Sequence, residues 1–288
     1  MSKPKILLQL DPDSQPSVFD SVVAVDSDVD QLFRHGDVSV DAVEALVHGA
    51  MFTRGPEDLK STAIFVGGSN VAAGEALLDA VTKCFFGPMR VSVMMDSNGS
   101  NTTAAAAVLA AARHVDLSTV TATVLATGPV GQRAALLLAR QGAIVRGTSR
   151  RVERAEIACQ SVRDTVPDAK ITAHETTTSD GLAGALEGAD VVINAGAAGV
   201  EIVSSELRAS LNSLKVAVDL NAVPPLGIGG IDVMDKAVEH DGAICYGAIG
   251  VGGLKMKIHK AAVRSLFETN DLVLDAEQIF AIGQALDA

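Results

Sequence analysis

Aromatic residues are scarce in this chain of 288 residues, in which they make up 3% of the total with no Trp and a single Tyr. Hydrophobic residues nevertheless reach 48%, so the core must be built from Ala, Val, Leu and Ile. This composition suits a parallel α/β sheet, whose strands are covered on both faces and are rich in branched aliphatic residues. The length is enough for one large core or two modest ones.

Basic residues are too few to balance the acids, since 23 Lys and Arg against 35 Asp and Glu leave a net charge of −12. This charge argues against nucleic acid or an anionic membrane as a main partner. The three Cys form no C-x-x-C pattern and are typical of free thiols in a reducing compartment. The N-terminal apolar run is too short for a signal peptide, and no uninterrupted apolar segment reaches membrane-spanning length. We therefore expect a cytoplasmic protein.

Hydrolytic and metal-binding motifs are also missing. The sequence has no G-x-S-x-G, no H-E-x-x-H and no grouping of Cys and His at metal-ligand spacing. None of its six His falls in a glycine-rich strand end, and we interpret them as surface or structural residues. The chemistry must then be carried mainly by a cofactor. Hydride removal from a carbon held between two nitrogens fits, because the nitrogen lone pairs stabilise the resulting cation without a proton relay.

The segment Thr121–Arg154 has the pattern of a dinucleotide-binding βαβ unit, with strands expected at 122–126 and 143–147. The turn between the first strand and the helix is formed by Thr127, Gly128, Pro129, Val130 and Gly131. Its glycines let the backbone approach a pyrophosphate, whose charge the helix N-terminus favours. The first glycine of G-x-G-x-x-G is Ala126 here, and alanine is tolerated if that residue keeps an extended backbone.

The end of the second strand indicates which dinucleotide is bound. An NAD-preferring site has Asp or Glu about 20 residues after the first glycine, where it binds the ribose 2′-OH. This chain has Ser149, Arg150 and Arg151 there, with no acid before Glu153. A carboxylate would repel a 2′-phosphate, whereas guanidiniums bind it through paired hydrogen bonds. The sequence therefore predicts NADP, and the alternative interpretation is a solvated basic loop.

Other strand ends carry small or polar residues. Ala195 and Gly196 follow an expected strand at 189–194 and would let the nicotinamide ring lie close to the backbone. Asn221 opens a loop rich in Pro and Gly, which we interpret as a rigid functional loop. A last strand is expected at 243–249, followed by a helix start that includes Lys255. A lysine there opposes the helix dipole, which favours a functional role.

The first part of the chain alternates strand and helix by itself. Asp20 falls in the first turns of a helix with Ser17 as its expected N-cap, and the alternative is that it only complements the helix dipole. A polar cluster that includes Asp96, Ser97 and Asn98 lies between a strand and an Ala-rich helix. It is either a capped turn or a site for a heterocycle with many donors and acceptors.

The predicted fold class is α/β, with a Rossmann-type parallel sheet domain and a smaller α/β domain separated by a cleft. We expect the smaller domain to span residues 1–110 and the Rossmann domain residues 111–267. The C-terminal helices at 268–288 are expected to pack on the first domain.

Several long runs of residues carry a family resemblance along nearly the whole chain. They are PSVFD (16–20), TAIFVGG (62–68), FFGPMRVSVMMDSNGSNTTAAA (85–106), TGPVG (127–131), DLNAVPPLGIGGID (219–232) and GAIGVGGLKMKIHKA (247–261). In these runs the chain resembles the NADP-dependent methylene-tetrahydromethanopterin dehydrogenases of methylotrophic bacteria. The resemblance implies reversible hydride transfer from methylene-tetrahydromethanopterin to NADP⁺, giving the methenyl form, in one-carbon (formaldehyde) oxidation.

The resemblance also implies a site for the pterin and a homo-oligomer that is trimeric in relatives. The pterin site would include Asp20, Asp96, Ser97, Asn98, Asn221 and Lys255. Asp20 would stabilise the developing cation, and Lys255 would orient a ring oxygen or a carboxylate. Two alternatives stay open: the same reaction with methylene-tetrahydrofolate, or a non-catalytic NADP-binding redox sensor. No metal is implied.

Overall fold

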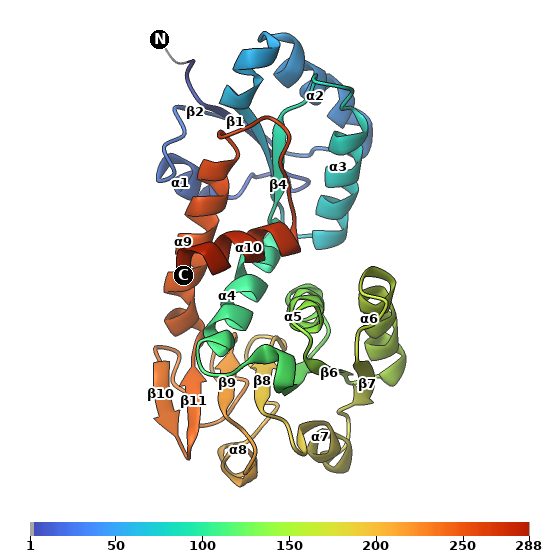
Figure 1. Cartoon of the computed structure of the whole chain (residues 1–288), viewed down its shortest axis with the longest axis vertical. Coiled ribbons are helices and arrows are strands. Elements are labelled where there is room, and N and C mark those ends of the chain that lie inside the picture. Colours follow the sequence, from blue (N-terminus) through green and yellow to red (C-terminus); the bar gives the residue numbers. More distant parts are fainter. Residues whose placement is uncertain (1–2, 288) are drawn as a thin grey trace. The chain divides into compact units, whose positions relative to one another are not determined.

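The computed structural model describes residues 3–287 and divides the chain into two compact units (Figure 1). The first unit contains the chain up to Thr102 and from Met256 onward, and the second is Thr103–Lys255. Both crossings lie inside helices, α4 (Ser100–Ala112) and α9 (Ala248–Ser265). The expected bounds at 110 and 267 differ from these because no loop marks either crossing. Residues 1, 2 and 288 of the expected domain ranges lie outside the described part of the chain.

The first unit is built on a five-stranded parallel sheet in the order β12-β4-β3-β1-β2. Its strands are β1 (Ile6–Leu10), β2 (Gln31–His35), β3 (Thr62–Val66), β4 (Ser92–Met95) and β12 (Val273–Leu274). Its helices are α1 (Val18–Val25), α2 (Val43–Phe52), α3 (Val71–Lys83) and α10 (Ala276–Asp287), with 3₁₀ turns at Val40–Ala42, Pro56–Ser61 and Ser97–Gly99. Helices α2 and α3 cover one face of the sheet, and α1 and the C-terminal half of α9 cover the other (Figure 1).

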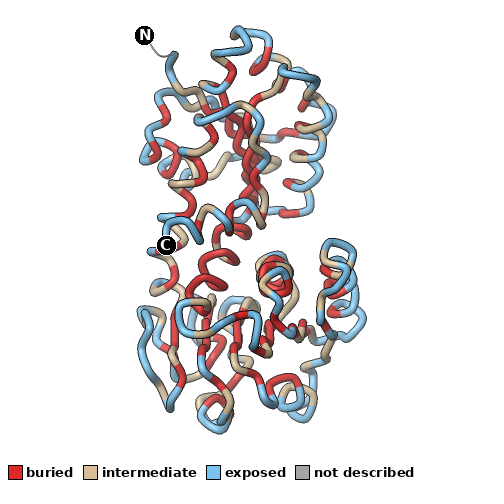
Figure 2. The backbone as a smooth tube through the Cα atoms, viewed as in Figure 1, coloured by how far each residue is buried: buried red, intermediate tan, exposed pale blue. Residues whose placement is uncertain are grey.

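The core of this unit follows from the alternation of side chains along the strands. Leu8, Ile64 and Val66 belong to one buried cluster with Val47 of α2 and Leu77 of α3. Every residue of β3 and β4 is buried (Figure 2). Each fully buried aliphatic side chain contributes about 1.5–3 kcal/mol, so central strands covered on both faces can be uniformly apolar.

The second unit is a seven-stranded sheet in the order β10-β11-β9-β8-β5-β6-β7, parallel except for the β10–β11 pair. Its strands are β5 (Thr121–Leu125), β6 (Ile144–Ser149), β7 (Ile171–Glu175), β8 (Val191–Asn194), β9 (Val216–Asp219), β10 (Lys236–His240) and β11 (Ala243–Tyr246). Its helices are α5 (Pro129–Arg140), α6 (Val152–Thr165), α7 (Ser179–Leu186) and α8 (Ser205–Ser210), with a 3₁₀ turn at Leu117–Thr119. Helices α5 and α6 lie on one face, and α7 and α8 on the other (Figure 1).

The expected α/β class and Rossmann-type sheet are confirmed. One boundary was wrong: the strand expected at 243–249 ends at Tyr246, and α9 already begins at Ala248. Lys255 therefore lies inside α9 rather than at its start, and the argument from the helix dipole does not apply to it.

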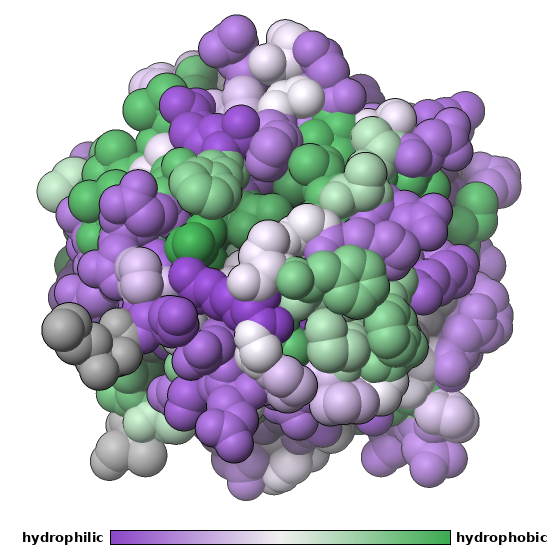
Figure 3. Space-filling view, turned by 90° about the horizontal axis from the view of Figure 1, so that it is seen from above, coloured by the Kyte–Doolittle hydropathy of each residue, from purple (hydrophilic) through white to green (hydrophobic). Residues whose placement is uncertain are grey.

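The described surface has mixed polarity. In the face shown in Figure 3, hydrophobic side chains form separate groups between hydrophilic ones. The exposed aromatic side chains Phe52 and Phe86 contact each other, with ring centroids 6.1 Å apart. Among residues 3–287, no helix is long and apolar enough to cross a membrane.

Candidate functional site

The carboxyl ends of three neighbouring strands define one edge of the second unit. In the sheet register Leu125 of β5 is paired with Asn194 of β8, and Asn194 with Asp219 of β9. The loops after these strands therefore leave the sheet at the same edge. The strand order reverses between β5 and β8, since β6 and β7 lie on one side and β9 and β11 on the other. Open α/β sheets bind ligands at such a switch point.

The glycine turn predicted from the sequence lies at this edge. Gly128 is the N-cap of α5, Pro129 is its first residue, and a β-carbon built on Gly128 has no atom within 4 Å. The first amides of α5, including those of Val130 and Gly131, have no acceptor within the helix, so they are suited to an anion. Thr127 accepts a hydrogen bond at its carbonyl from the Gln132 amide at 3.0 Å. The turn thus bonds to its helix through Gln132 and is open at Gly128.

Ala126 departs from the expected extended backbone, because its φ is +69°. The tight turn requires a left-handed residue where the motif has its first glycine, and alanine is strained there by about 1–2 kcal/mol. The reason lies in the packing of the turn on α5. A β-carbon on Gly131 would lie 2.0 Å from the Ala126 carbonyl oxygen, so helix and turn approach as closely as glycine permits. The tolerance of alanine argued from an extended conformation was therefore wrong.

The basic loop follows β6, which ends at Ser149. Thr148 is buried, and its hydroxyl accepts the Ala126 N–H at 3.2 Å, which ties this strand end to the glycine turn. Arg150 and Arg151 are both exposed. Within residues 3–287 neither guanidinium has a hydrogen-bond or ion-pair partner. Both remain available to bind an anionic ligand.

A buried polar pair holds the loops beyond β8 and β9. Asn194 donates from Nδ2 to Asp219 Oδ1 at 2.7 Å and accepts the Gly196 N–H at 3.0 Å. Asp219 also accepts the N–H groups of Asn221 and Ile228, at 3.0 and 2.9 Å. These bonds fix the backbone at Gly196, and the preceding Ala195 is half-buried. Sequence reasoning missed Asn194 and Asp219, although each is a polar residue ending an apolar strand.

Asn221 is buried and serves its own loop. Its Oδ1 accepts the Val223 N–H at 2.9 Å, and its Nδ2 donates to the Pro225 carbonyl at 3.2 Å. The Pro224–Pro225 peptide in this loop is cis. The other end of the loop is held by the buried Arg208, which donates from Nε to the Gly229 carbonyl at 3.0 Å. Hydrogen bonds thus hold the loop at both ends, with the Asn221 amide inside it.

In the first unit Asp20 lies near the ends of β1 and β3. The expected N-cap of α1 is confirmed, since the Ser17 hydroxyl accepts the Asp20 N–H at 3.2 Å. A β-carbon on Gly67 would lie 3.6 Å from Asp20 Oδ2 and 3.2 Å from Asp11 Oδ2. Asp11 is buried, which raises the pKa of its carboxyl, and it accepts the N–H groups of Asp13 and Ser17. Two carboxyl groups thus lie at the carboxyl edge of this sheet.

The polar cluster after β4 contains the predicted capped turn. Asp96 is fully buried and caps α4, because its Oδ1 accepts the N–H groups of Asn101 and Thr102 and its Oδ2 accepts the Thr102 hydroxyl at 2.6 Å. Ser97 is also fully buried, and its hydroxyl donates to the Gly67 carbonyl at 2.6 Å. Both side chains therefore build the loop.

Asn98 is the exposed member of this cluster. Its φ of +54° turns the chain outward, and its N–H donates to the Gly68 carbonyl at 2.6 Å. Helix α3 packs closely against the loop, because a β-carbon on Gly74 would lie 1.9 Å from Ser97 Oγ. The loop geometry thus presents Asn98, rather than Asp96 or Ser97, to the surface of this unit.

His259 was not expected at a site, and it lies beneath this edge. The ring is fully buried in α9 and stacks on Phe65 of β3, with centroids 5.6 Å apart and planes inclined by 18°. Its Nδ1 lies 3.8 Å from Asp96 Oδ2. Phe19 of α1 approaches the same ring at 6.3 Å. No pattern in the sequence distinguishes this His from the others.

The predicted residues thus form two groups, one in each unit. The glycine turn, Ser149, Arg150, Arg151, Ala195, Gly196 and Asn221 share the carboxyl edge of the second sheet. Asp20, Asp96, Ser97 and Asn98 share the carboxyl edge of the first. Lys255 is half-buried in α9. The described residues hold no cluster of three or more His, Cys, Asp or Glu suited to a metal ion.

These features define the class of protein: a two-unit α/β protein with a Rossmann-type sheet. Solved structures of similar fold include shikimate 5-dehydrogenase from Listeria monocytogenes, at a TM-score of 0.57 and 13% identity over 98% of this chain and 96% of that one. At that identity the likeness concerns the fold alone.

Closer relatives identify the family. The model of the methylene-tetrahydromethanopterin dehydrogenase N-terminal domain matches residues 18–98. The bifunctional protein MdtA of Methylorubrum extorquens is 46% identical over 99% of this chain and 100% of its own length. The NAD(P)-dependent methylenetetrahydromethanopterin dehydrogenase of the same organism is 32% identical over 96% of this chain and 97% of its own. The chain belongs to the methylene-tetrahydromethanopterin dehydrogenase family, and the predicted resemblance is confirmed.

Proposed function

We propose that the protein transfers a hydride reversibly from methylene-tetrahydromethanopterin to NADP⁺, which gives the methenyl form in one-carbon oxidation. Bound NADP⁺ would supply the acceptor for the hydrogen that leaves the methylene carbon with the C–H electron pair. The two flanking nitrogens stabilise the cation that remains, so no protein group must take up a proton. In a chain of this family, the observation that carries the proposal is the pair of exposed guanidiniums of Arg150 and Arg151, which have no partner among residues 3–287 and follow the strand that is bonded to the glycine turn.

The second unit supplies the groups that hold NADP. The open space over Gly128 and the free amides of α5 suit the pyrophosphate. Ser149 and the two guanidiniums would bind the 2′-phosphate. Ala195 and Gly196, fixed by the Asn194–Asp219 pair, would carry the nicotinamide. The residues present therefore fit this cofactor.

The NADP assignment can be tested by replacing Arg150 and Arg151 together with Ala. Loss of charged hydrogen bonds costs about 1.5–3 kcal/mol each, so the KM for NADP should rise at least about tenfold while the KM for NAD barely changes. Arg154→Ala removes an exposed charge one turn further along α6 and serves as the matched control. Equal effects of the double variant on both cofactors would refute the 2′-phosphate assignment.

The groups proposed for the pterin are Asp20, Asp96, Ser97 and Asn98 of the first unit and Asn221 and Lys255 of the second. The Asp20 carboxylate would stabilise the developing cation, as fixed charges do where charge develops in a transition state. Asn98 would bind the heterocycle directly, while the buried Asp96 and Ser97 hold the loop that presents it. Asn221 would act likewise through its own loop. Lys255 would orient a ring oxygen or a carboxylate of the substrate.

Asp20→Ala is the direct test of the pterin side. It should lower kcat more than it weakens NADP binding, because the carboxylate acts on the reacting carbon. Asp13→Ala is the control, since Asp13 is a nearby carboxylate that instead holds Ser69 through two hydrogen bonds. A normal kcat in Asp20→Ala would remove this residue from the site.

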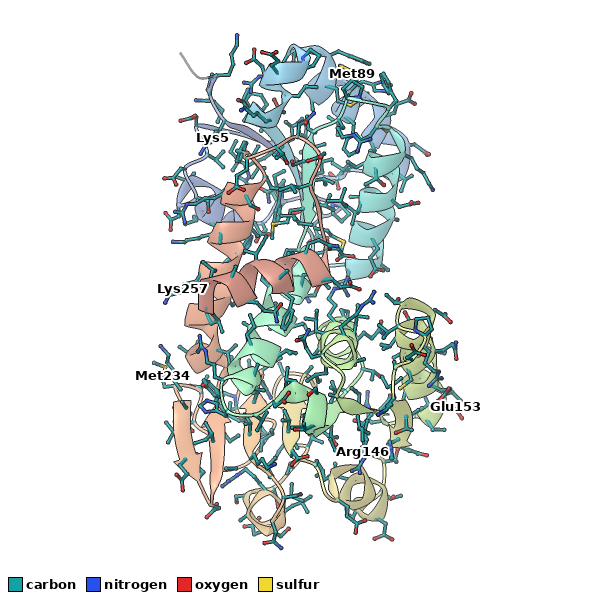
Figure 4. The ribbon with its side chains drawn as sticks, in the orientation of Figure 1. Lys5, Met89, Arg146, Glu153, Met234 and Lys257 are labelled. Carbon is teal, nitrogen blue, oxygen red and sulfur yellow. The ribbon has the colours of Figure 1, made fainter. Side chains whose placement is uncertain are left out.

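Lys255 has its own matched control in α9. Lys255→Met should raise the KM for the pterin and leave the KM for NADP unchanged. Lys257→Met, at the exposed lysine labelled in Figure 4, should change neither constant. Identical kinetics in both variants would contradict a substrate-orienting role.

A parallel assay of NADP reduction separates the substrate alternatives. We expect turnover with methylene-tetrahydromethanopterin to exceed turnover with methylene-tetrahydrofolate. The reverse order would favour the folate-linked reaction. Tight NADP binding without turnover of either substrate would support a redox sensor instead.

We also propose that the protein works in the cytoplasm as a homo-oligomer, a trimer by family resemblance. Light scattering coupled to size-exclusion chromatography should give about three times the chain mass of 29.6 kDa. A monomer would contradict the assembly, and recovery in a membrane fraction would contradict the location.

A further inference from the structure

The loop after β7 contacts the basic loop at two points. The Thr176 N–H donates to the Ser149 carbonyl at 3.0 Å, and the Thr177 hydroxyl donates to the Arg150 carbonyl. The next residue, Thr178, has a different function, because its hydroxyl accepts the Gly181 N–H at 3.1 Å and caps α7. Only the first two threonines therefore act on the basic loop.

The peptide between Arg150 and Arg151 is held on both sides. Its carbonyl accepts from Thr177, and its N–H donates to Ser149 Oγ at 3.5 Å. The orientation of this peptide sets the directions in which both arginine side chains leave the backbone. It is fixed by the loop alone, since the guanidiniums are exposed and have no partner among residues 3–287.

We propose that Thr177 is a positioning residue for cofactor specificity, which aims the guanidiniums of Arg150 and Arg151 at the 2′-phosphate by fixing the peptide between them. This inference rests on the proposed binding of NADP to the same loop. NAD lacks the 2′-phosphate, so Thr177 should affect NADP alone. Glu153 lies in the first turn of α6 (Figure 4). Without the Thr177 bond, Arg150 or Arg151 can pair with this carboxylate rather than with the 2′-phosphate.

Direct binding tests the role without any need for pterin turnover. The dissociation constants of NADP and NAD are measured by titration calorimetry on the full chain. Thr177→Val keeps the side-chain shape but removes the hydroxyl. It should raise the dissociation constant of NADP roughly threefold to tenfold, which corresponds to the loss of one neutral hydrogen bond. The dissociation constant of NAD should not change. Thr177→Ser keeps the hydroxyl and should restore NADP binding.

Thr178→Val is the matched control, because it loosens the same loop at the α7 cap without touching Arg150. It should lower the melting temperature and leave the ratio of the two dissociation constants unchanged. The proposal is overturned if Thr177→Val weakens the binding of NADP and of NAD equally. It is also overturned if Thr178→Val changes the ratio of the two dissociation constants as much as Thr177→Val does.

A second background separates this inference from the proposed function. In the Arg150→Ala, Arg151→Ala double variant, Thr177→Val should have no further effect on NADP. If the double variant weakens NADP binding but Thr177→Val alone does not, the two guanidiniums still bind NADP and Thr177 has no part in that binding. If the double variant leaves NADP binding unchanged, both ideas fail at the cofactor site. If the protein binds NADP in preference to NAD but does not turn over the pterin, only the proposed reaction is contradicted.

Discussion

Replacing Ala126 with Gly should stabilise the protein, although the residue lies in the cofactor-binding turn. Its φ of +69° carries a strain of about 1–2 kcal/mol for alanine, which glycine does not have. Glycine also makes the unfolded chain more flexible, which offsets about 0.4–1 kcal/mol of that gain. The difference between the two ranges runs from about 0 to about 1.6 kcal/mol, and its midpoint is a net stabilisation of about 0.8 kcal/mol.

Thermal unfolding followed by circular dichroism or calorimetry can resolve this change. For domains of 150–250 residues, 1 kcal/mol corresponds to a shift of about 2–4 °C in Tm, so we expect a rise of about 1–4 °C. Ala237→Gly is a matched positive control, because Ala237 has a φ of +56° at the irregular pairing of β10 with β11.

Ala198→Gly is the negative control, since Ala198 is an exposed loop residue outside the positive-φ set. It should lower Tm or leave it unchanged, because only the unfolded chain gains freedom. If Ala126→Gly lowers Tm as Ala198→Gly does, the left-handed turn is refuted, and with it the close approach of Ala126 to α5.

Three further perturbations follow from the structure. Gly131→Ala should destabilise the second unit by about 1–3 kcal/mol and weaken NADP, because its β-carbon would lie 2.0 Å from a carbonyl oxygen; normal Tm and NADP affinity would contradict this packing. Burial, and to a smaller extent the nearby Arg113, lowers the pKa of His114 below 6.5, so the folded state binds this proton less well than the unfolded state. Its stabilising contribution is present above pH 6.5 and lost as pH falls, so the urea midpoint of His114→Gln should fall less on acidification than that of the wild type. Burial also raises the pKa of the Cys159 thiol, and that of Cys245 to about 11, so both should resist a thiol reagent in the native protein at about pH 8 and react after denaturation.

The central strands were predictable from sequence, and of the four edge strands only β7 was. β3, β5 and β8 are almost entirely buried and rich in Ala, Val, Ile and Leu because both faces of a parallel sheet are covered. β2 and β10 lie at sheet edges and are largely exposed, so they have no apolar run. β12, of two residues, is defined by its pairing with β4. An edge strand is set by its neighbour, which the sequence pattern does not contain.

The glycine turn and the basic loop were located correctly, but the backbone of the turn was not. The spacing of glycines places residues on a strand end, and it carries no information on how closely a helix approaches. The turn combines a left-handed φ at Ala126 with a close approach of Gly131 to the Ala126 carbonyl, and the glycine spacing specifies neither. His259 was missed for a similar reason, because its stacking on Phe65 joins residues far apart in the chain.

The sequence does not show which of several neighbouring polar residues holds a loop and which one is accessible to a ligand, and the structure does. At three strand ends, a buried polar residue anchors the loop, and the residue two positions later is more accessible: Asp96 and Asn98, Thr148 and Arg150, Asn194 and Gly196. The anchor accepts a backbone N–H of the turn or helix beside it, which pairs a group that has little access to water. Its side chain is thereby committed, and ligand chemistry passes to the later residue. Substitution of an anchor should therefore weaken binding and stability together, whereas substitution of Asn98 or Arg150 should weaken binding alone.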